Sequence, residues 1–169
     1  MAISVDAQIL IWGIKRQATK NREEMIERAV AFFRQCSNDH QQVYLPAQSF
    51  SEFLVGYDPA KRRELLTLLP RGFIVAPLDA KAAAIAADLQ TNWNLLREIG
   101  AEFGTTRQQI KSDINVLASS IAVGAAYLYS EDAQMNRLAQ GKMLVKGLPL
   151  VRPKAGHLFD PEDVDGPDC

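Results

Sequence analysis

Short apolar runs alternate along this chain with longer segments that have the spacing of helices. The expected strands are residues 2–5, 42–46, 72–77, 126–130 and 148–153. The expected helices are residues 21–37, 47–57, 58–70, 79–99, 109–125 and 131–141. Strands that are separated by helices need crossover connections, and such connections join parallel strands. The alternation therefore predicts an α/β fold, a three-layer α/β/α domain with a mostly parallel central sheet of about five strands.

Local signals mark several boundaries of these helices. Asp58 followed by Pro59 is typical of an N-cap and the first position of a helix. Gly100 is expected to end the long Ala-rich helix that precedes it. A Thr-x-x-Gln pattern then allows Thr105 or Thr106 to cap the next helix.

Length and composition are ordinary for one globular domain. The chain has 169 residues, of which 47% are hydrophobic and 23% charged, and its net charge is -1. This balance gives no overall positive field of the kind that nucleic-acid-binding proteins often have, although a local basic patch can serve the same purpose. The two cysteines lie far apart and form neither a disulfide framework nor a zinc-binding spacing. With no signal-peptide pattern and no apolar run of about 18 residues, we expect a cytoplasmic protein with no contact to a membrane.

Four acidic residues stand beside strand ends or helix starts. Asp6 and Asp132 each follow a strand, Glu52 lies in the helix after the second strand, and Asp113 lies near the start of an apolar helix. Ligands of parallel sheets collect at the carboxyl ends of the strands, so one edge could gather all four. Each acid also has a local explanation, as a helix cap, a residue favoured by the helix dipole or a solvated side chain. Their convergence favours a site for Mg²⁺ or Mn²⁺, which prefer oxygen ligands.

The motifs around these acids resemble those of the PIN-domain family of metal-dependent ribonucleases. The matching segments are "ISVDAQIL", "SFSEFL", "KSDINVLASSIA" and "SED". The resemblance implies that Asp6, Glu52, Asp113 and Asp132 are catalytic and bind Mg²⁺ or Mn²⁺. It also implies that Ser130, which stands where the family has threonine, supports them with its hydroxyl. Some members carry another acid two residues after the last Asp, and this chain has Gln134 there.

The same resemblance implies a function and partners. The expected activity is hydrolysis of RNA phosphodiester bonds that leaves a 5′-phosphate and a 3′-hydroxyl. Because the family includes VapC-like toxins, we expect RNA as the substrate, a small antitoxin protein as a partner and a second copy of the chain as another. Residues 1–155 would form the PIN-like nuclease domain, and the acidic residues 156–169 a flexible tail.

Basic and aromatic residues supply candidates for holding RNA. The cations expected to contact phosphates are Lys15, Arg16, Arg107 and Lys111. The run from Lys61 to Arg63 is more typical of a solvated helix face. Trp12 and Trp93 could stack on unpaired bases, but packing in the core is the favoured interpretation for both.

Two other functions are compatible with parts of the sequence. A PIN-like domain with weak or no catalysis would bind RNA or another protein, and Ser130 and Gln134 at their positions agree with this alternative. An acid-cluster phosphatase on a doubly wound sheet is the other. The segment "DAQ" after the first strand argues against it, because it lacks an Asp-x-Asp pair.

Overall fold

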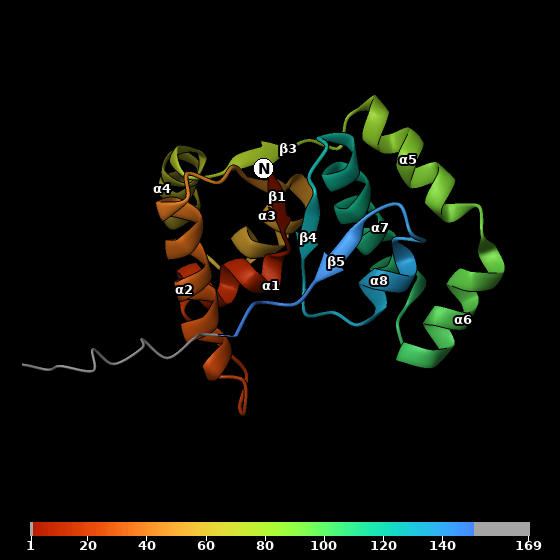
Figure 1. The fold of residues 1–169 in the computed structure, drawn as a ribbon, viewed down its shortest axis with the longest axis horizontal. Coiled ribbons are helices and arrows are strands. Elements are labelled where there is room, and N and C mark those ends of the chain that lie inside the picture. The colour runs from red at the N-terminus through yellow and green to blue at the C-terminus, as the bar shows by residue number, and fades with distance from the viewer. Residues whose placement is uncertain (1, 151–169) are drawn as a thin grey trace, which may run out of the picture.

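The computed structural model describes residues 2–150, which form one five-stranded sheet with helices on both faces (Figure 1). The strands are β1 (Ile3–Val5), β2 (Val43–Pro46), β3 (Ile74–Ala76), β4 (Tyr127–Tyr129) and β5 (Leu144–Lys146). Their order is β3-β2-β1-β4-β5, and every neighbouring pair is parallel. The predicted fold class is therefore confirmed, and β1 lies at the centre of the sheet.

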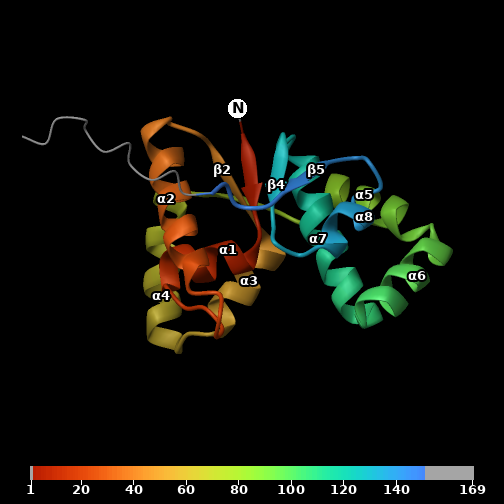
Figure 2. The same cartoon turned by 60° about the horizontal axis from the view of Figure 1, so that its bottom comes forward.

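The helices fall into two groups that cover opposite sides of the sheet (Figure 2). The first group is α1 (Ala7–Leu10), the π-helical turn η1 (Ile11–Lys15), α2 (Glu24–Asn38), α3 (Ala47–Val55), α4 (Pro59–Leu68) and the short η2 (Leu69–Arg71). The second group is α5 (Ala80–Gln90), α6 (Trp93–Phe103), α7 (Arg107–Ala122) and α8 (Gln134–Leu138). Each group has its own apolar core, which includes Leu10 and Phe53 in the first and Leu89 and Leu117 in the second. None of the helices within residues 2–150 is long and apolar enough to cross a membrane.

The strand order brings several loops and helix ends to one edge of the sheet. The polypeptide leaves the carboxyl end of β1 at Asp6 and enters α1, and it leaves β2 directly into α3. On the other side of β1, the chain leaves β4 at Ser130 and enters the loop before α8. Helix α7 contacts both β2 and α3, which brings its residues close to the same edge.

One predicted helix is divided in the structure. The segment 79–99 forms α5 and α6, because Asn92 begins a new helix by accepting a hydrogen bond from the Leu95 N–H. Gly100 lies inside α6, and the helix ends instead at Gly104, whose φ of 64° is the left-handed conformation that glycine adopts without strain. The predicted end at Gly100 is therefore wrong by one turn.

The last strand lies earlier than predicted. β5 ends at Lys146, and Gly147 to Leu150 are not strand. The Leu148 N–H donates to the Glu131 carboxylate at 2.6 Å, and Pro149 has no N–H to donate, so the pairing with β4 stops before them. Residues 151–153 of the predicted strand, the domain boundary at residue 155 and the predicted tail lie outside the described residues.

Two predicted caps are confirmed. The Asp58 side chain accepts hydrogen bonds from the N–H groups of Ala60 and Lys61 at the start of α4. Thr106 and Gln109 form a reciprocal capping box at the start of α7.

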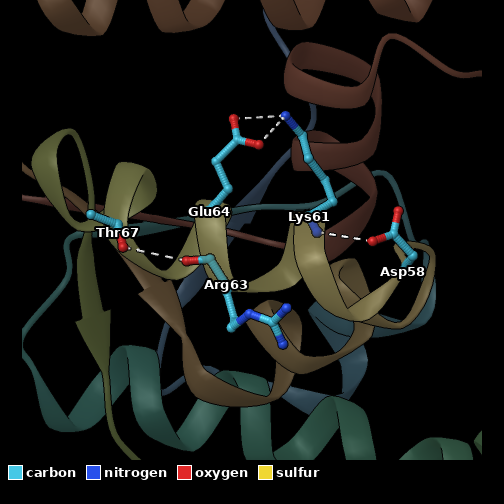
Figure 3. Close-up of polar contacts among 5 residues, drawn as sticks. All are labelled: Asp58, Lys61, Arg63, Glu64 and Thr67. Atoms are coloured by element: carbon cyan, nitrogen blue, oxygen red, sulfur yellow. Dashed lines mark hydrogen bonds and ion pairs between the residues drawn. The ribbon is translucent and has the colours of Figure 1, made fainter.

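The basic run of α4 is exposed to solvent, as predicted, and Figure 3 shows the polar contacts of Lys61 and Arg63. The Lys61 ammonium lies 2.8 Å from the Glu64 carboxylate one turn later, and the Thr67 hydroxyl donates to the Arg63 carbonyl. Arg63 is exposed. Exposed ion pairs of this kind contribute little to stability, whereas the Arg62 guanidinium donates to the carbonyls of Leu54 and Tyr57 and so ties α4 to the end of α3.

Candidate metal centre

The four predicted carboxylates line one cavity of about 670 Å³ at the carboxyl edge of the sheet. Asp6 follows β1, Glu52 lies on α3, Asp113 lies on the N-terminal half of α7, and Asp132 lies in the loop after β4. Ser130 lines the same cavity. Residues that are as far apart in the sequence as Asp6 and Asp132 meet here because β1 and β4 are neighbours in the sheet.

Asp6 both caps α1 and lines the carboxylate cavity. Its Oδ1 accepts a hydrogen bond from the Ala7 N–H at 2.6 Å, which caps α1. The hydroxyls of Ser49 and Ser130 also donate to this carboxylate, at 3.2 Å and 2.9 Å. Burial raises the pKa of Asp6 and the nearby Glu52 charge raises it further, whereas the three donors act in the opposite direction. The carboxylate is therefore held in place on its helix while it faces other acids.

Asp113 is the acid on which the other three carboxylates all act. Burial raises its pKa to about 7, and the charges of Asp132, Asp6 and Glu52 contribute in that order. Like charges in a partly buried site disfavour ionisation, because each added negative charge repels those already there. A raised pKa with this cause is typical of functional sites, since a structure selected for stability alone would pair such a group with a cation.

Gln134, which stands where some PIN-domain proteins have another acid, lies between two of the acids. Its Nε2 donates to Asp113 Oδ2 at 2.7 Å and to Asp132 Oδ2 at 3.0 Å. Its Oε1 accepts from the Thr105 hydroxyl at 2.8 Å, so the buried amide has partners at both ends. Gln134 thus holds the two carboxylates at a fixed separation without adding charge.

We expect Gln134→Ala to lower the affinity for Mn²⁺ by about 10- to 100-fold, the usual effect of losing a hydrogen-bond partner of metal ligands. Without the amide, Asp113 and Asp132 lose the donor that orients both of them. Titration of the metal-free protein with Mn²⁺ measures the change. Gln35→Ala, an exposed position on α2, is the matched control and should bind Mn²⁺ like the wild type. Equal affinities in the two variants would contradict a role for Gln134 in positioning.

Neutral side chains also donate hydrogen bonds to Glu52. The Ser112 hydroxyl donates to Glu52 at 2.7 Å, and the Gln48 amide donates to the same oxygen at 3.0 Å. The Ser130 hydroxyl, besides donating to Asp6, accepts from the Asp132 N–H at 3.2 Å. Ser130 therefore links two of the acids, which is the placement that its predicted supporting role requires.

The four carboxylates are oxygen ligands of the kind that a hard divalent cation prefers, although they lie apart from one another. None of the four carboxylates forms an ion pair with a Lys, Arg or His of residues 2–150. Their negative charge is thus left for a cation that the chain does not supply. Across this part of the chain, however, no three acids, histidines or cysteines are gathered closely enough to hold an ion as they stand. In place of an ion, neutral donors such as Ser130, Ser112 and Gln134 contact the carboxylates.

The four cations predicted to bind RNA lie in three places. The Lys15 ammonium donates to the Gly56 carbonyl at 3.2 Å and lies 4.9 Å from the centre of the Tyr57 ring. Arg16 is exposed just after η1. Arg107 and Lys111 line a second cavity, on the other side of α7.

Among the other residues that line the carboxylate cavity are Trp12, Thr19 and Arg22. Thr19 and Arg22 come from the segment between η1 and α2. Trp12 is buried, as predicted, and its indole N–H has no acceptor within residues 2–150. Arg22 belongs to the basic cluster that follows the first strand in the sequence, but its place beside the carboxylates depends on the course of the segment after the π-helical turn, which has no recognisable pattern.

Comparison with known proteins shows a similarity of fold. No protein-family profile matches the sequence, and no curated protein matches it. A chain of the crystal structure of VapBC2 from Rickettsia felis, bound to a DNA fragment from their promoter, has a similar fold. The TM-score is 0.61 at 11% identity, over 88% of this chain and 100% of that chain. The likeness agrees with the predicted PIN-like arrangement of helices around a parallel sheet.

Proposed function

We propose that this chain is an endoribonuclease that depends on Mg²⁺ or Mn²⁺ and acts as the toxin of a toxin–antitoxin pair. The observation that carries the proposal is the convergence of Asp6, Glu52, Asp113 and Asp132 on one cavity at the carboxyl edge of the sheet. The pKa of Asp113, raised to about 7 in part by the other three, is the electrostatic sign of that convergence. The PIN-like fold and the motif resemblance support the same conclusion.

Each residue of the site has a distinct task in this proposal. Asp6, at the centre of the sheet, and Asp113 and Asp132, linked by Gln134, would hold the cation directly, and Glu52 would complete the set. When bound, a divalent cation supplies an activated water and offsets negative charge on the phosphoryl and leaving oxygens. Ser130 and Ser49 orient Asp6, and Gln134 orients Asp113 and Asp132. Hydrolysis would leave a 5′-phosphate and a 3′-hydroxyl.

The proposed partner follows from the fold comparison. The similar chain comes from a VapBC2 structure that includes promoter DNA. By analogy, a small antitoxin protein would bind this chain and restrain its cleavage of RNA, and a second copy of the chain would complete the assembly.

The test is cleavage of a single-stranded RNA by the purified wild-type protein. We expect cleavage with Mn²⁺ or Mg²⁺, none with EDTA, and products that carry 5′-phosphates. Binding of the RNA without cleavage under any of these ions would overturn the proposed catalysis. It would favour the alternative of a PIN-like module that binds RNA, with which the separated carboxylates and Gln134 also agree.

A further inference from the structure

A second cavity, the Trp93 groove, lies between α6 and α7 and has no role in the site described above. Its volume is about 500 Å³, within the range of pockets that hold small organic ligands. Its lining includes Trp93, Leu96 and Ile110, with Arg97, Arg107 and Lys111. Apolar side chains together with several cations suit a ligand that has both a flat apolar part and an anionic part.

Trp93 is exposed where the sequence predicted a core residue. Half of it, 51%, is accessible to solvent, whereas Trp12 is 3% accessible. The Arg107 guanidinium lies 5.0 Å from the centre of the Trp93 ring. An exposed indole beside a guanidinium is an arrangement on which unpaired bases stack, because both groups are planar and every base has an aromatic face.

The cations of the Trp93 groove have no acidic partners in the structure. Arg97, Arg107 and Lys111 form no ion pair within residues 2–150, although Glu98 and Glu102 lie on the same helix as Arg97. Those two acids pair instead with Arg137 of α8. The groove therefore keeps three positive charges in a chain whose net charge is -1. Such a charge complements the phosphates of a polynucleotide.

The groove and the carboxylate cavity share one wall. On α7, Arg107 and Lys111 line the groove, while Ser112 and Asp113 line the carboxylate cavity. Thr105, which lines the groove, donates its hydroxyl to Gln134 in the carboxylate cavity. A strand that crossed this part of α7 would meet both cavities in succession.

We infer that the Trp93 groove binds a nucleotide of the single-stranded RNA that is cut at the carboxylate cavity, with its base on Trp93 and its phosphates on Arg97, Arg107 and Lys111. This inference rests on the proposed ribonuclease function for its substrate. Double-stranded RNA does not fit, because its bases are already stacked on each other. An acidic peptide would satisfy the cations but would leave the exposed indole without a function.

The experiment follows the fluorescence of the wild-type protein in EDTA, where RNA binds without being cut. We expect a single-stranded hexaadenylate to quench the signal saturably and a duplex of the same length to quench it far less. Trp93→Phe should abolish the quenching, which assigns the signal to Trp93 rather than to the buried Trp12. Quenching that survives in Trp93→Phe, or equal quenching by the duplex, would overturn the inference.

The affinity of each variant for a labelled single-stranded RNA measures how much Trp93 and the cations contribute to binding. Trp93→Ala should weaken binding about tenfold, Trp93→Phe should retain most of the affinity, and Arg97→Ala should reduce the dependence of binding on salt. Arg63→Ala on α4 is the matched control, since it removes an exposed arginine outside both cavities.

If Trp93→Ala bound RNA as tightly as the wild type and Mn²⁺-dependent cleavage were intact, the groove would not be an RNA site, and the proposed function would be unaffected. If polyglutamate quenched Trp93 and RNA did not, the groove would be a site for an acidic protein segment. Binding of RNA at Trp93 by a wild-type protein that never cleaves would support the groove and overturn the nuclease.

Discussion

Asp113→Asn is expected to reduce Mn²⁺-dependent cleavage of RNA by at least about a hundredfold, because even indirect support of a metal ligand is worth about 10- to 100-fold. The substitution preserves the size of the side chain and an oxygen that can accept the Gln134 hydrogen bond. It removes only the negative charge of the carboxylate, which the three acidic neighbours disfavour. Initial cleavage rates of a single-stranded RNA at saturating Mn²⁺ measure the effect.

Asp88→Asn is the matched control for this substitution. Asp88 is exposed on α5, where it pairs with Lys142 at 3.7 Å, and it lies outside the carboxylate cavity. It should cleave RNA like the wild type. Full activity in Asp113→Asn would show that the cavity is not the site of the reaction.

The second large effect should be on stability, and it depends on both pH and metal. The pKa of Asp113 is about 7 in the folded protein and near 3.8 when unfolded, so the folded state binds more protons between these values. Without metal, the contribution of Asp113 to the free energy of unfolding should therefore fall as the pH rises from about 4 to about 7. In EDTA at pH 8, Asp113→Asn should melt at a higher temperature than the wild type, and near pH 4 this difference should disappear.

Metal should stabilise the wild type and narrow its difference from Asp113→Asn. A cation that binds only the folded state stabilises it by about 2.7 kcal/mol at a hundred times its Kd, or about 5–10 °C for a domain of this size. Mn²⁺ should therefore raise the melting temperature of the wild type at pH 8 and shift Asp113→Asn little. Thermal melts of both proteins with and without Mn²⁺ measure this, and equal shifts would contradict the assignment of Asp113 as a ligand.

Asp6 needs a separate pair of variants, because it both caps α1 and faces the cavity. Asparagine caps a helix about as well as aspartate, whereas alanine costs about 0.5–2 kcal/mol at an N-cap. Asp6→Asn should thus lose most of the Mn²⁺-induced shift with little loss of the helix. Asp6→Ala should lose the shift and the cap together.

The parallel sheet and the meeting of the four acids at one cavity follow from the sequence because both depend on local patterns with a simple geometric consequence. Short apolar runs separated by helices imply parallel strands, and parallel strands bring residues such as Asp6 and Asp132 to one edge. The caps at Asp58 and Thr106 are equally local, since each depends on side chains within three residues of the helix start.

What the sequence could not predict depends on contacts between distant segments. Gln134 bridges Asp113 and Asp132 only because α7 and α8 pack together. The break between α5 and α6 leaves Trp93 at an exposed helix start, which the helical spacing of the segment did not indicate. The end of β5 is set by the hydrogen bond from Leu148 to Glu131, a partner 17 residues away.

We propose that the four carboxylates of one cavity bind a divalent cation for RNA cleavage. Calorimetric titration of Mn²⁺ into the metal-free wild type at pH 8, beside Asp113→Asn and Asp88→Asn, tests it most directly. We predict saturable binding by the wild type and by Asp88→Asn, and a loss of that binding in Asp113→Asn. An absence of binding by the wild type, or binding that Asp113→Asn retains in full, would contradict it.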